Sequence, residues 1–162
     1  MSGMKRFTLI FLSCLLAFTA SGQGKLIGSS EDRRPAWTKR DVDRYEVMKA
    51  SGESTVSLED AKEKAFAELR GTVVRSVSSY LMSTDIMGTD AGEVKKNVEN
   101  SLFVRNISES TAIQVYWEHR MVRKQDVYIY YVLYNFNDTE KKKAALEINR
   151  EHSNTTKILN SL

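Results

Sequence analysis

The chain has 162 residues, of which 28% are charged, and its formal net charge is +3. Lys5 and Arg6 fall in an N-terminal segment typical of export signals, and without them 22 basic and 21 acidic residues leave a charge of +1. We therefore expect no nucleic-acid partner, because binding to a phosphate backbone depends on an excess of basic residues.

Residues 1–22 have the pattern of a secretory signal peptide. A basic start at Lys5 and Arg6 precedes an apolar run over residues 7–18. Ala20-Ser21-Gly22 then supplies the small residues that precede a cut before Gln23. The apolar run is too short to span a bilayer as a permanent anchor. We therefore expect an exported protein, either periplasmic or secreted.

The only cysteine, Cys14, lies inside this signal and raises the alternative of an outer-membrane lipoprotein acylated at that residue. The residue three positions earlier is Phe11 rather than leucine, and the apolar run continues beyond the cysteine. For these reasons we favour soluble export, and expect membrane contact only if Cys14 is lipidated. Cleavage before Gln23 would leave no thiol, and so neither a disulfide nor a thiolate metal ligand.

Residues 23–40 are predicted to be a flexible lead-in, because this Gly/Ser-rich and then charged segment has little apolar surface to bury. Trp37 is its bulky residue, and we expect it to fix the end of the segment to the folded body. Residues 41–151 are long enough to form a single domain around one core. That domain is expected to begin with a weakly alternating strand, Tyr45 to Ala50.

The strongest predicted element is a long helix from about Leu58 to Leu81. Ser57-Leu58-Glu59-Asp60 has the pattern of a capping box, in which Ser57 accepts a hydrogen bond from the backbone amide of Asp60. Apolar residues then recur at steps of three and four, and they are Leu58, Ala61, Ala65, Leu69, Val73, Val77 and Tyr80. This spacing predicts an amphipathic helix with one buried side.

A short helix, a hairpin and a last helix are predicted after residue 92. Residues 93–103 repeat apolar residues at four-residue steps, whereas Thr111 to Arg123 and Val127 to Asn137 have the two-residue period of strands. Asp138-Thr139 can cap a helix over residues 140–151, and residues 152–162 form a polar tail. The order strand-helix-helix-strand-strand-helix predicts an α+β fold, with a long amphipathic helix and shorter helices packed on a small antiparallel sheet.

The segment Ser51-Gly52-Glu53-Ser54 contains a Gly-x-Ser pattern like that of a nucleophile elbow. Val56 stands where that motif has its second glycine, and the sequence has no Gly-Lys-Ser/Thr for a phosphate loop. We interpret the segment as a plain strand-to-helix connection with a permissive backbone at Gly52. Replacing Ser54 by Ala is then expected to be nearly neutral, whereas Ser57 to Ala is expected to cost ~1 kcal/mol through the lost cap.

No catalytic, metal or cofactor site is predicted, and we expect that the protein is not an enzyme. His119 falls in a strand and His152 in the polar tail, and no motif places a serine or an acid to act with either. A zinc site would need carboxylates for its remaining ligands. Asp85 to Asp90 lacks the spacing of an EF-hand, although adventitious calcium binding there stays an alternative.

Aromatic residues gather on the two hairpin strands, and they are Tyr116, Trp117, Tyr128, Tyr130, Tyr131, Tyr134 and Phe136. Packing against a helix is the favoured explanation for them. Exposed rings would instead form a protein interface or, as a further alternative, stack on sugars. The candidate contact residues for a partner or ligand are Trp117, Tyr128, Tyr130, Tyr134 and Trp37.

Several short motifs resemble a bacterial envelope family. Pro35-Ala36-Trp37, Lys49 to Ser54, and Leu58 to Ala65 resemble the family of the twenty-kilodalton membrane-associated lipoprotein (LPP-twenty), related to the N-terminal domain of the flagellar protein FlgT. Val115-Tyr116-Trp117 and the strand from Tyr128 to Phe136 resemble its final hairpin. This resemblance implies an α+β fold, an exported location, an accessory or assembly role in the envelope, and no catalytic residues.

We therefore expect an exported, non-enzymatic envelope protein that binds a protein partner or assembles with itself. The aromatic strand surface and unpaired sheet edges would supply the contact. The alternative is a small-molecule or glycan-binding domain, with its pocket between the long helix and the aromatic hairpin. An exposed row of rings would favour a partner, a concave cluster would favour a ligand, and full burial would favour neither.

Overall fold

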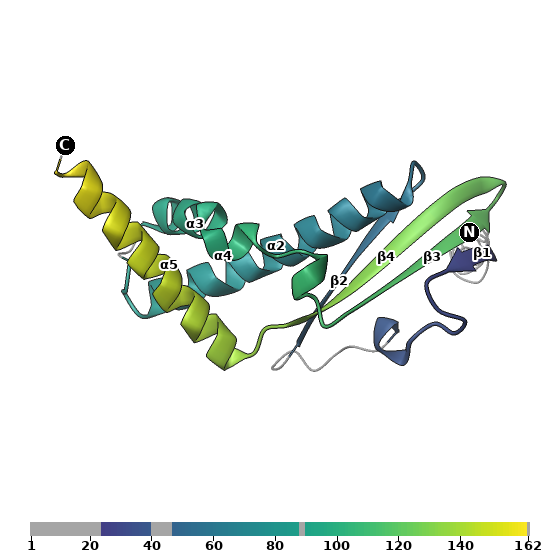
Figure 1. Cartoon of the computed structure of the whole chain (residues 1–162), viewed down its shortest axis with the longest axis horizontal. Coiled ribbons are helices and arrows are strands. Elements are labelled where there is room, and N and C mark those ends of the chain that lie inside the picture. Colours follow the sequence, from purple (N-terminus) through teal and green to yellow (C-terminus); the bar gives the residue numbers. More distant parts are fainter. Residues whose placement is uncertain (1–23, 40–46, 88–89, 162) are drawn as a thin grey trace, which may run out of the picture.

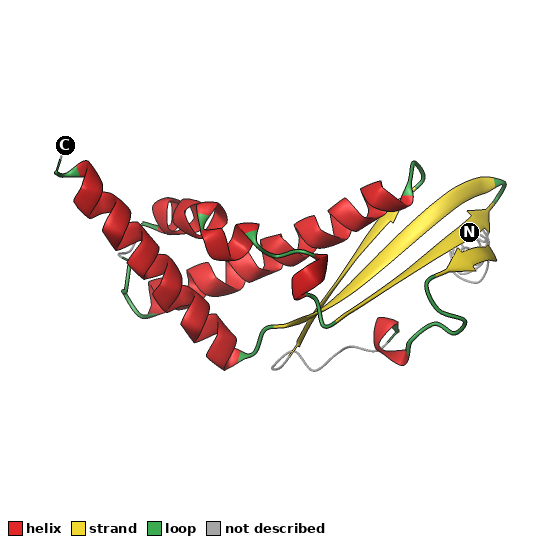
Figure 2. Cartoon of the chain, viewed as in Figure 1, coloured by secondary structure: helices red, strands yellow, loops and turns green. Residues whose placement is uncertain are grey.

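The computed structural model describes residues 24–39, 47–87 and 90–161. One four-stranded sheet carries a long helix on one face, and shorter helices gather beyond its end (Figure 1, Figure 2). The predicted α+β class is therefore confirmed. The predicted signal peptide, residues 1–22, and the start of the predicted first strand, residues 45–46, lie outside the described residues.

The sheet has the strand order β1-β3-β4-β2, and neighbouring strands are antiparallel. Its strands are β1 (Lys25–Ser29), β2 (Val47–Ser54), β3 (Gln114–Val122) and β4 (Gln125–Asn135). The predicted hairpin is formed by β3 and β4. Its turn, predicted at residues 124–126, lies at Arg123 and Lys124, whose φ angles of 50° and 67° match the two central residues of a type I′ turn.

The helix α2 (Leu58–Ser83) covers one face of the sheet and packs mainly on β2 and β4. The side chain of Ser57 caps it as predicted, accepting a hydrogen bond from the amide of Asp60 at 3.1 Å. Three further helices pack around its C-terminal half, and they are α3 (Ala91–Asn100), α4 (Leu102–Arg105) and α5 (Asp138–Leu159). The apolar core lies between these helices and the sheet.

Gly52 lies inside β2, not in a connection as the sequence analysis expected. A Cβ atom at this position would lie 2.0 Å from the carbonyl oxygen of Ala61 and 2.5 Å from the amide nitrogen of Ala65. A glycine is needed because α2 crosses the strand backbone here without room for a side chain. The strand therefore continues to Ser54, and residues 55–57 alone connect it to α2.

The N-terminal segment, residues 24–39, is not the unstructured lead-in that its composition predicted. β1 pairs with β3, from Lys25 opposite Met121 to Ser29 opposite Glu118. A 3-10 turn, η1 (Ala36–Thr38), follows it. The sequence pattern missed β1 because this short strand lacks the alternation of a half-buried strand, and pairing with a neighbour from far along the chain stabilises it instead.

The predicted polar tail is also ordered as helix, because α5 continues to Leu159. Beyond Ile148 this helix buries no apolar residue among those described. The apolar spacing therefore stops close to residue 151, the predicted end of the helix. In this part of the helix, hydroxyl groups donate to carbonyl oxygens one turn earlier, from Ser153, Thr155 and Thr156. Such bonds satisfy polar side chains within the helix itself.

Two other helix boundaries differ from the prediction. The side chain of Asn137 caps α5 by accepting from the amide of Glu140 at 2.9 Å, in place of the predicted Asp138-Thr139 cap. The predicted helix over residues 93–103 is divided at Ser101, whose hydroxyl accepts from the amide of Val104 and so starts α4. A second 3-10 turn, η2 (Glu109–Thr111), precedes β3.

Candidate functional site

The aromatic residues proposed as contact residues lie mostly in the core. Tyr130 and Tyr134 are buried on the face of β4 that packs against α2, and the ring centroid of Phe66 lies 6.3 Å from that of Tyr130. Trp117 and Tyr128 are partly buried against the same core. Because α2 covers their rings, Tyr130 and Tyr134 are not available to a partner, which corrects the expectation of an aromatic contact row.

Trp37 lies on the other side of the sheet, which we call the outer face. Its ring meets Tyr131 of β4 edge to face, with centroids 6.4 Å apart and an angle of 86° between the planes. Tyr131 in turn stacks on Tyr116 of β3 at 6.0 Å. Trp37 thus fixes the N-terminal segment to the sheet, as the sequence predicted, and β4 is covered on both faces.

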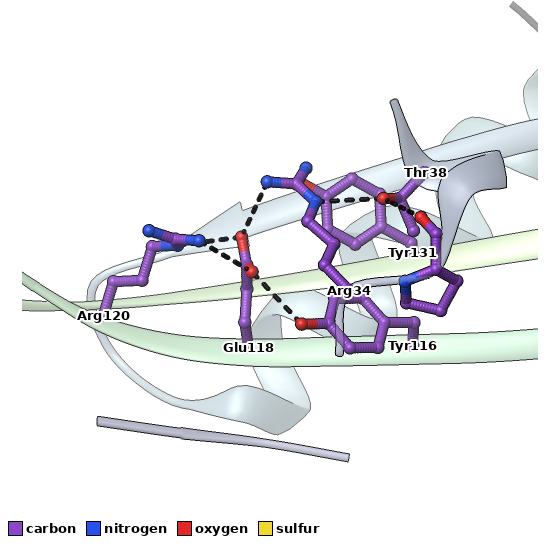
Figure 3. Close-up of polar contacts among 7 residues, drawn as sticks. Arg34, Thr38, Tyr116, Glu118, Arg120 and Tyr131 are labelled. Carbon is purple, nitrogen blue, oxygen red and sulfur yellow. Dashed lines mark hydrogen bonds and ion pairs between the residues drawn. The ribbon is translucent and has the colours of Figure 1, made fainter. Parts of the chain in front are cut away.

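Glu118 of β3 is the centre of a polar cluster on the outer face (Figure 3). Its side chain is fully buried, and one carboxylate oxygen lies 3.3 Å from Nη1 of Arg34 and 2.9 Å from Nε of Arg120. Nη2 of Arg120 donates to the other oxygen at 3.0 Å, and the hydroxyl of Tyr116 donates to it at 3.3 Å. A single buried carboxylate is therefore shared by two guanidinium groups.

Arg34 links this cluster to the N-terminal segment. Its Nε donates to Oγ1 of Thr38 at 2.9 Å, and its Nη2 donates to the hydroxyl of Tyr131. The guanidinium carbon also lies 4.9 Å from the centroid of the Tyr131 ring, within the range of a cation–π contact. Arg34 thus contacts the sheet and its own segment together (Figure 3).

The surroundings of Glu118 keep the two neighbouring phenols neutral. Burial is the main cause that raises the pKa of Tyr116 and of Tyr131. The hydrogen bond to Glu118 raises the pKa of Arg120, whose side chain stays cationic. Paired charges of this kind fix geometry, so the cluster acts as a clamp that holds residues 24–39 on the sheet.

Sequence reasoning missed this clamp, although β3 carried a signal for it. Tyr116, Glu118 and Arg120 alternate along the strand, so they share one face. Glu118 and Arg120 are an acid and a base two residues apart on one face of a largely apolar hairpin. This spacing indicates a buried ion pair. The sequence could not name the third member, Arg34, since it lies in a segment without a helix or strand pattern.

A hollow of about 270 Å³ lies beside α2, but not where the sequence predicted a ligand pocket. Its lining comes from residues 62–70 of α2 and from residues 107–110, and includes no residue of the aromatic hairpin. Nζ of Lys62 lies 2.9 Å from the carboxylate of Glu109, and Arg70 donates to the carbonyl oxygen of Ile107 at 3.1 Å. The hydrogen bond between Lys62 and Glu109 lowers the pKa of Glu109 and raises that of Lys62. The cations of this hollow are thus engaged within the chain, which weakens the alternative of a ligand-binding domain.

His119 and Asp90, an acid of the loop after α2, have structural partners. Nε2 of His119 lies 2.6 Å from Oδ1 of Asp126, and its ring stacks on Tyr128 with centroids 4.4 Å apart. Asp90 caps α3 by accepting from the amide of Glu93 at 2.8 Å. Within the described residues, no three histidine, cysteine or acidic side chains come together in a group that could hold a metal ion.

The two edges of the sheet differ in what covers them. Along β2, the amide of Ser51 donates to the carboxylate of Glu68 at 2.8 Å, and the carbonyl oxygen of Glu53 accepts from Nζ of Lys64 at 3.3 Å. Both side chains come from α2, so the helix satisfies backbone groups of this edge at Ser51 and Glu53. The outer edge of β1 has no neighbouring strand within the described residues.

Comparison with known proteins gave no match, whether to a family model, to a curated protein or to a solved structure. Over residues 24–39, 47–87 and 90–161, none of the helices combines the length and the apolar character needed to cross a membrane.

The surface of β1 is apolar as well as open. Leu26 and Ile27 are consecutive residues of the strand, and their side chains are 45% and 49% exposed. Sequence reasoning named unpaired sheet edges as a contact surface but did not identify β1 as a strand. With the aromatic row inside the core, this open edge is the candidate binding surface.

Proposed function

We propose that the protein is exported and works as a non-enzymatic accessory or assembly protein of the cell envelope, binding a protein partner or another copy of itself. One observation carries the binding part of this proposal: the outer edge of β1 is open among the described residues, whereas side chains of α2 bond to the edge of β2 at Ser51 and Glu53. An uncovered edge strand presents backbone donors and acceptors to which an extended segment of another chain can pair.

The side chains of β1 support a specific contact. An incoming strand would cover Leu26 and Ile27, which are exposed in the isolated chain. The strand is also short, begins at Lys25 and has a register shift between Leu26 and Gly28. Short length, lysine and bulges are features that limit unspecific pairing along an edge. The contact therefore fits a single partner strand better than open-ended assembly.

Gly28 is consistent with close approach of another chain. A Cβ atom there would meet only the ring of Trp117, at 3.9 Å, which is an ordinary contact. Nothing in the chain's own described packing therefore demands glycine at this position, in contrast to Gly52. A glycine inside a strand often marks a place where another backbone comes near.

Sequence features support the export part of the proposal. The signal pattern predicts a cut before Gln23, and such a cut would remove none of the described residues, which begin at Gly24. The resemblance to the LPP-twenty family supports the same location. Mass spectrometry of the protein from its source cells tests export: we expect an N-terminus at Gln23 without acyl chains. An unprocessed chain, or a diacylated Cys14, would contradict soluble export.

The variant Ile27→Lys tests the binding surface in the processed protein. Val56→Lys is the matched control, because Val56 is also an exposed apolar residue but lies in the connection between β2 and α2. Sedimentation velocity over a range of concentrations measures self-association, and capture from envelope extract measures partner binding. We expect the complex formed by the unchanged protein to persist with Val56→Lys and to fall at least about tenfold with Ile27→Lys. Identical behaviour of all three proteins would contradict a contact at β1.

A further inference from the structure

One exposed side of α5 carries only basic charge. Lys142, Lys143, Arg150 and Lys157 are all exposed, and at 3.6 residues per turn they fall within an arc of about 100°. The opposite side of the helix carries its buried residues, Ala144, Ala145 and Ile148. The helix thus turns a cationic side to solvent along most of its length. We call these four residues together with Leu146 the basic face.

None of these four side chains forms an ion pair within the described part of the chain, although the charge of Lys142 helps to lower the pKa of Asp138. Lys141, one position earlier, differs because its Nζ lies 2.6 Å from Oδ1 of Asp138. Excluding the four, 18 basic and 21 acidic residues remain in the predicted processed chain. The protein is therefore polarised, with local positive charge on an otherwise acidic molecule.

Acidic residues border the basic face without entering it. Glu147 and Glu151 lie on the side of α5 that faces α4. The carboxylate of Glu151 accepts a hydrogen bond from the amide of Leu102 at 3.2 Å. Part of the nearby negative charge is thus engaged at the start of α4, which leaves the basic face dominated by cations.

Two leucines are exposed beside these cations. Leu146 lies within the basic face and is 60% exposed, and Leu102 of α4 is 53% exposed. Leu102 and Arg150 line the same shallow hollow between α4 and α5. The apolar side of α5 is packed in the core, so it is this exposed side that would meet a lipid surface, with the cations contacting anionic headgroups and the leucines reaching the acyl boundary.

The sequence led us to expect membrane contact only through a lipidated Cys14, whereas from the structure we propose that the basic face of α5 docks the protein on a membrane surface of anionic phospholipid. Its charge is complementary to such a surface, and each basic residue near it contributes substantially to binding. That the polyanion is a membrane, and not a nucleic acid, rests on the proposed export. The exposed leucines independently favour a lipid surface over a soluble polyanion. In Figure 1, α5 and the open strand β1 lie at opposite ends of the molecule, so membrane docking would leave β1 accessible.

Vesicle sedimentation with the processed full-length protein tests this proposal. The vesicles contain phosphatidylcholine alone, or phosphatidylcholine with about a third of phosphatidylglycerol. The test variant replaces the four basic residues together by Gln, as K142Q/K143Q/R150Q/K157Q. The control, K25Q/R33Q/K39Q/K96Q, removes the same charge from exposed positions outside α5. Circular dichroism and the midpoint of thermal unfolding check that both variants are folded.

We expect the unchanged protein to bind the anionic vesicles only, with binding that weakens as salt rises. The partition coefficient should fall by roughly several hundredfold in the α5 variant, because it loses four charges that each contribute about fivefold, and much less in the control. Leu146→Gln should also weaken binding to the vesicles. If the protein bound only through charge, this substitution would have no effect. Equal losses in both quadruple variants, no preference for anionic vesicles, or tighter binding to duplex DNA than to the vesicles would each overturn the proposal. These outcomes do not depend on whether β1 binds a partner.

Discussion

The guanidinium group of Arg34 lies 3.3 Å from the buried carboxylate of Glu118, and this ion pair connects the N-terminal segment to the outer face of the sheet. Arg34 follows β1 and precedes η1, whereas Glu118 belongs to β3 (Figure 3). Without their ion pair, the segment would depend on the β1–β3 pairing and on the contact of Trp37 with Tyr131. This ion pair therefore adds to the contacts that hold β1, and with it the open edge, in place.

Arg34→Met is expected to lower the free energy of unfolding by roughly 2 kcal/mol. The loss leaves Glu118 buried with one cation in place of two, although Arg120 still pairs with it and limits the cost. Chemical denaturation followed by Trp fluorescence measures the change. Arg33→Met, at an exposed position next to it, is the control and should change stability little. Equal effects of the two substitutions would show that Arg34 does not fasten the segment.

Gly52→Ala should destabilise the protein by roughly 3 kcal/mol or more. Its new Cβ would meet backbone atoms of Ala61 and Ala65, which cannot move without shifting α2 away from β2. Gly28→Ala is the matched control, since the space at Gly28 accepts a Cβ, and it should be neutral or slightly stabilising. The midpoints of thermal unfolding of the two variants measure the difference. A Gly52→Ala variant as stable as Gly28→Ala would show that α2 packs less closely on β2 than described.

The structure revises the sequence-based expectation for Ser54. Its side chain is buried, donates to the carboxylate of Asp60 and accepts from the amide of Val56 at 3.0 Å. Ser54→Ala should therefore cost at least as much as Ser57→Ala, about 1–2 kcal/mol, because it leaves the Val56 amide without this acceptor. Thr55→Ala, at an exposed position, serves as control. A near-neutral Ser54→Ala in urea denaturation would support the original interpretation.

Local signals were enough to predict much of this fold. The cap at Ser57 and the apolar spacing that follows it are contained within α2, and the two-residue period of β3 and β4 is equally local. Gly52 looked like a loop residue because its requirement comes from Ala61 and Ala65 in the helix that crosses it. Nothing in the sequence near Gly52 reveals that crossing.

The candidate surface was harder to predict than the fold. Tyr130 and Tyr134 are residue types that are common at protein interfaces, but they are buried, so they form part of the core and not of a contact surface. β1 depends on β3 for its partner, and a five-residue strand without alternation carries no periodic signal. The sequence could indicate that an unpaired edge was worth seeking, whereas only the strand order identifies which edge is open.

Acid should destabilise the folded chain in part through Glu109. The hydrogen bond from Lys62 lowers the pKa of Glu109 below its ordinary value of 4.5. A carboxyl with a lowered folded-state pKa stabilises the protein above its unfolded-state pKa, and this stabilisation is lost as the pH falls through the folded-state value. Between about pH 5 and pH 3, the free energy of unfolding should therefore fall less steeply in Glu109→Gln than in the unchanged protein.

Lys62→Met provides an independent check of that assignment. Without the ammonium group, Glu109 should titrate closer to its ordinary value, so this variant should flatten the same part of the profile. Asp60 and Asp138 also have lowered pKa values, because Lys64 and Lys141 donate hydrogen bonds to them, so part of the acid sensitivity should persist in both variants. Profiles parallel to that of the unchanged protein would contradict the role of the Lys62–Glu109 pair.

Photo-crosslinking in the source cells would reveal directly whether β1 is the contact edge of an exported binding protein. A photoreactive amino acid replaces Ile27 in one strain and Val56, exposed in the connection between β2 and α2, in another. We predict a discrete covalent adduct, to one envelope protein or to a second copy, from position 27 and not from position 56. The same adducts from both positions, or none from position 27, would contradict the account.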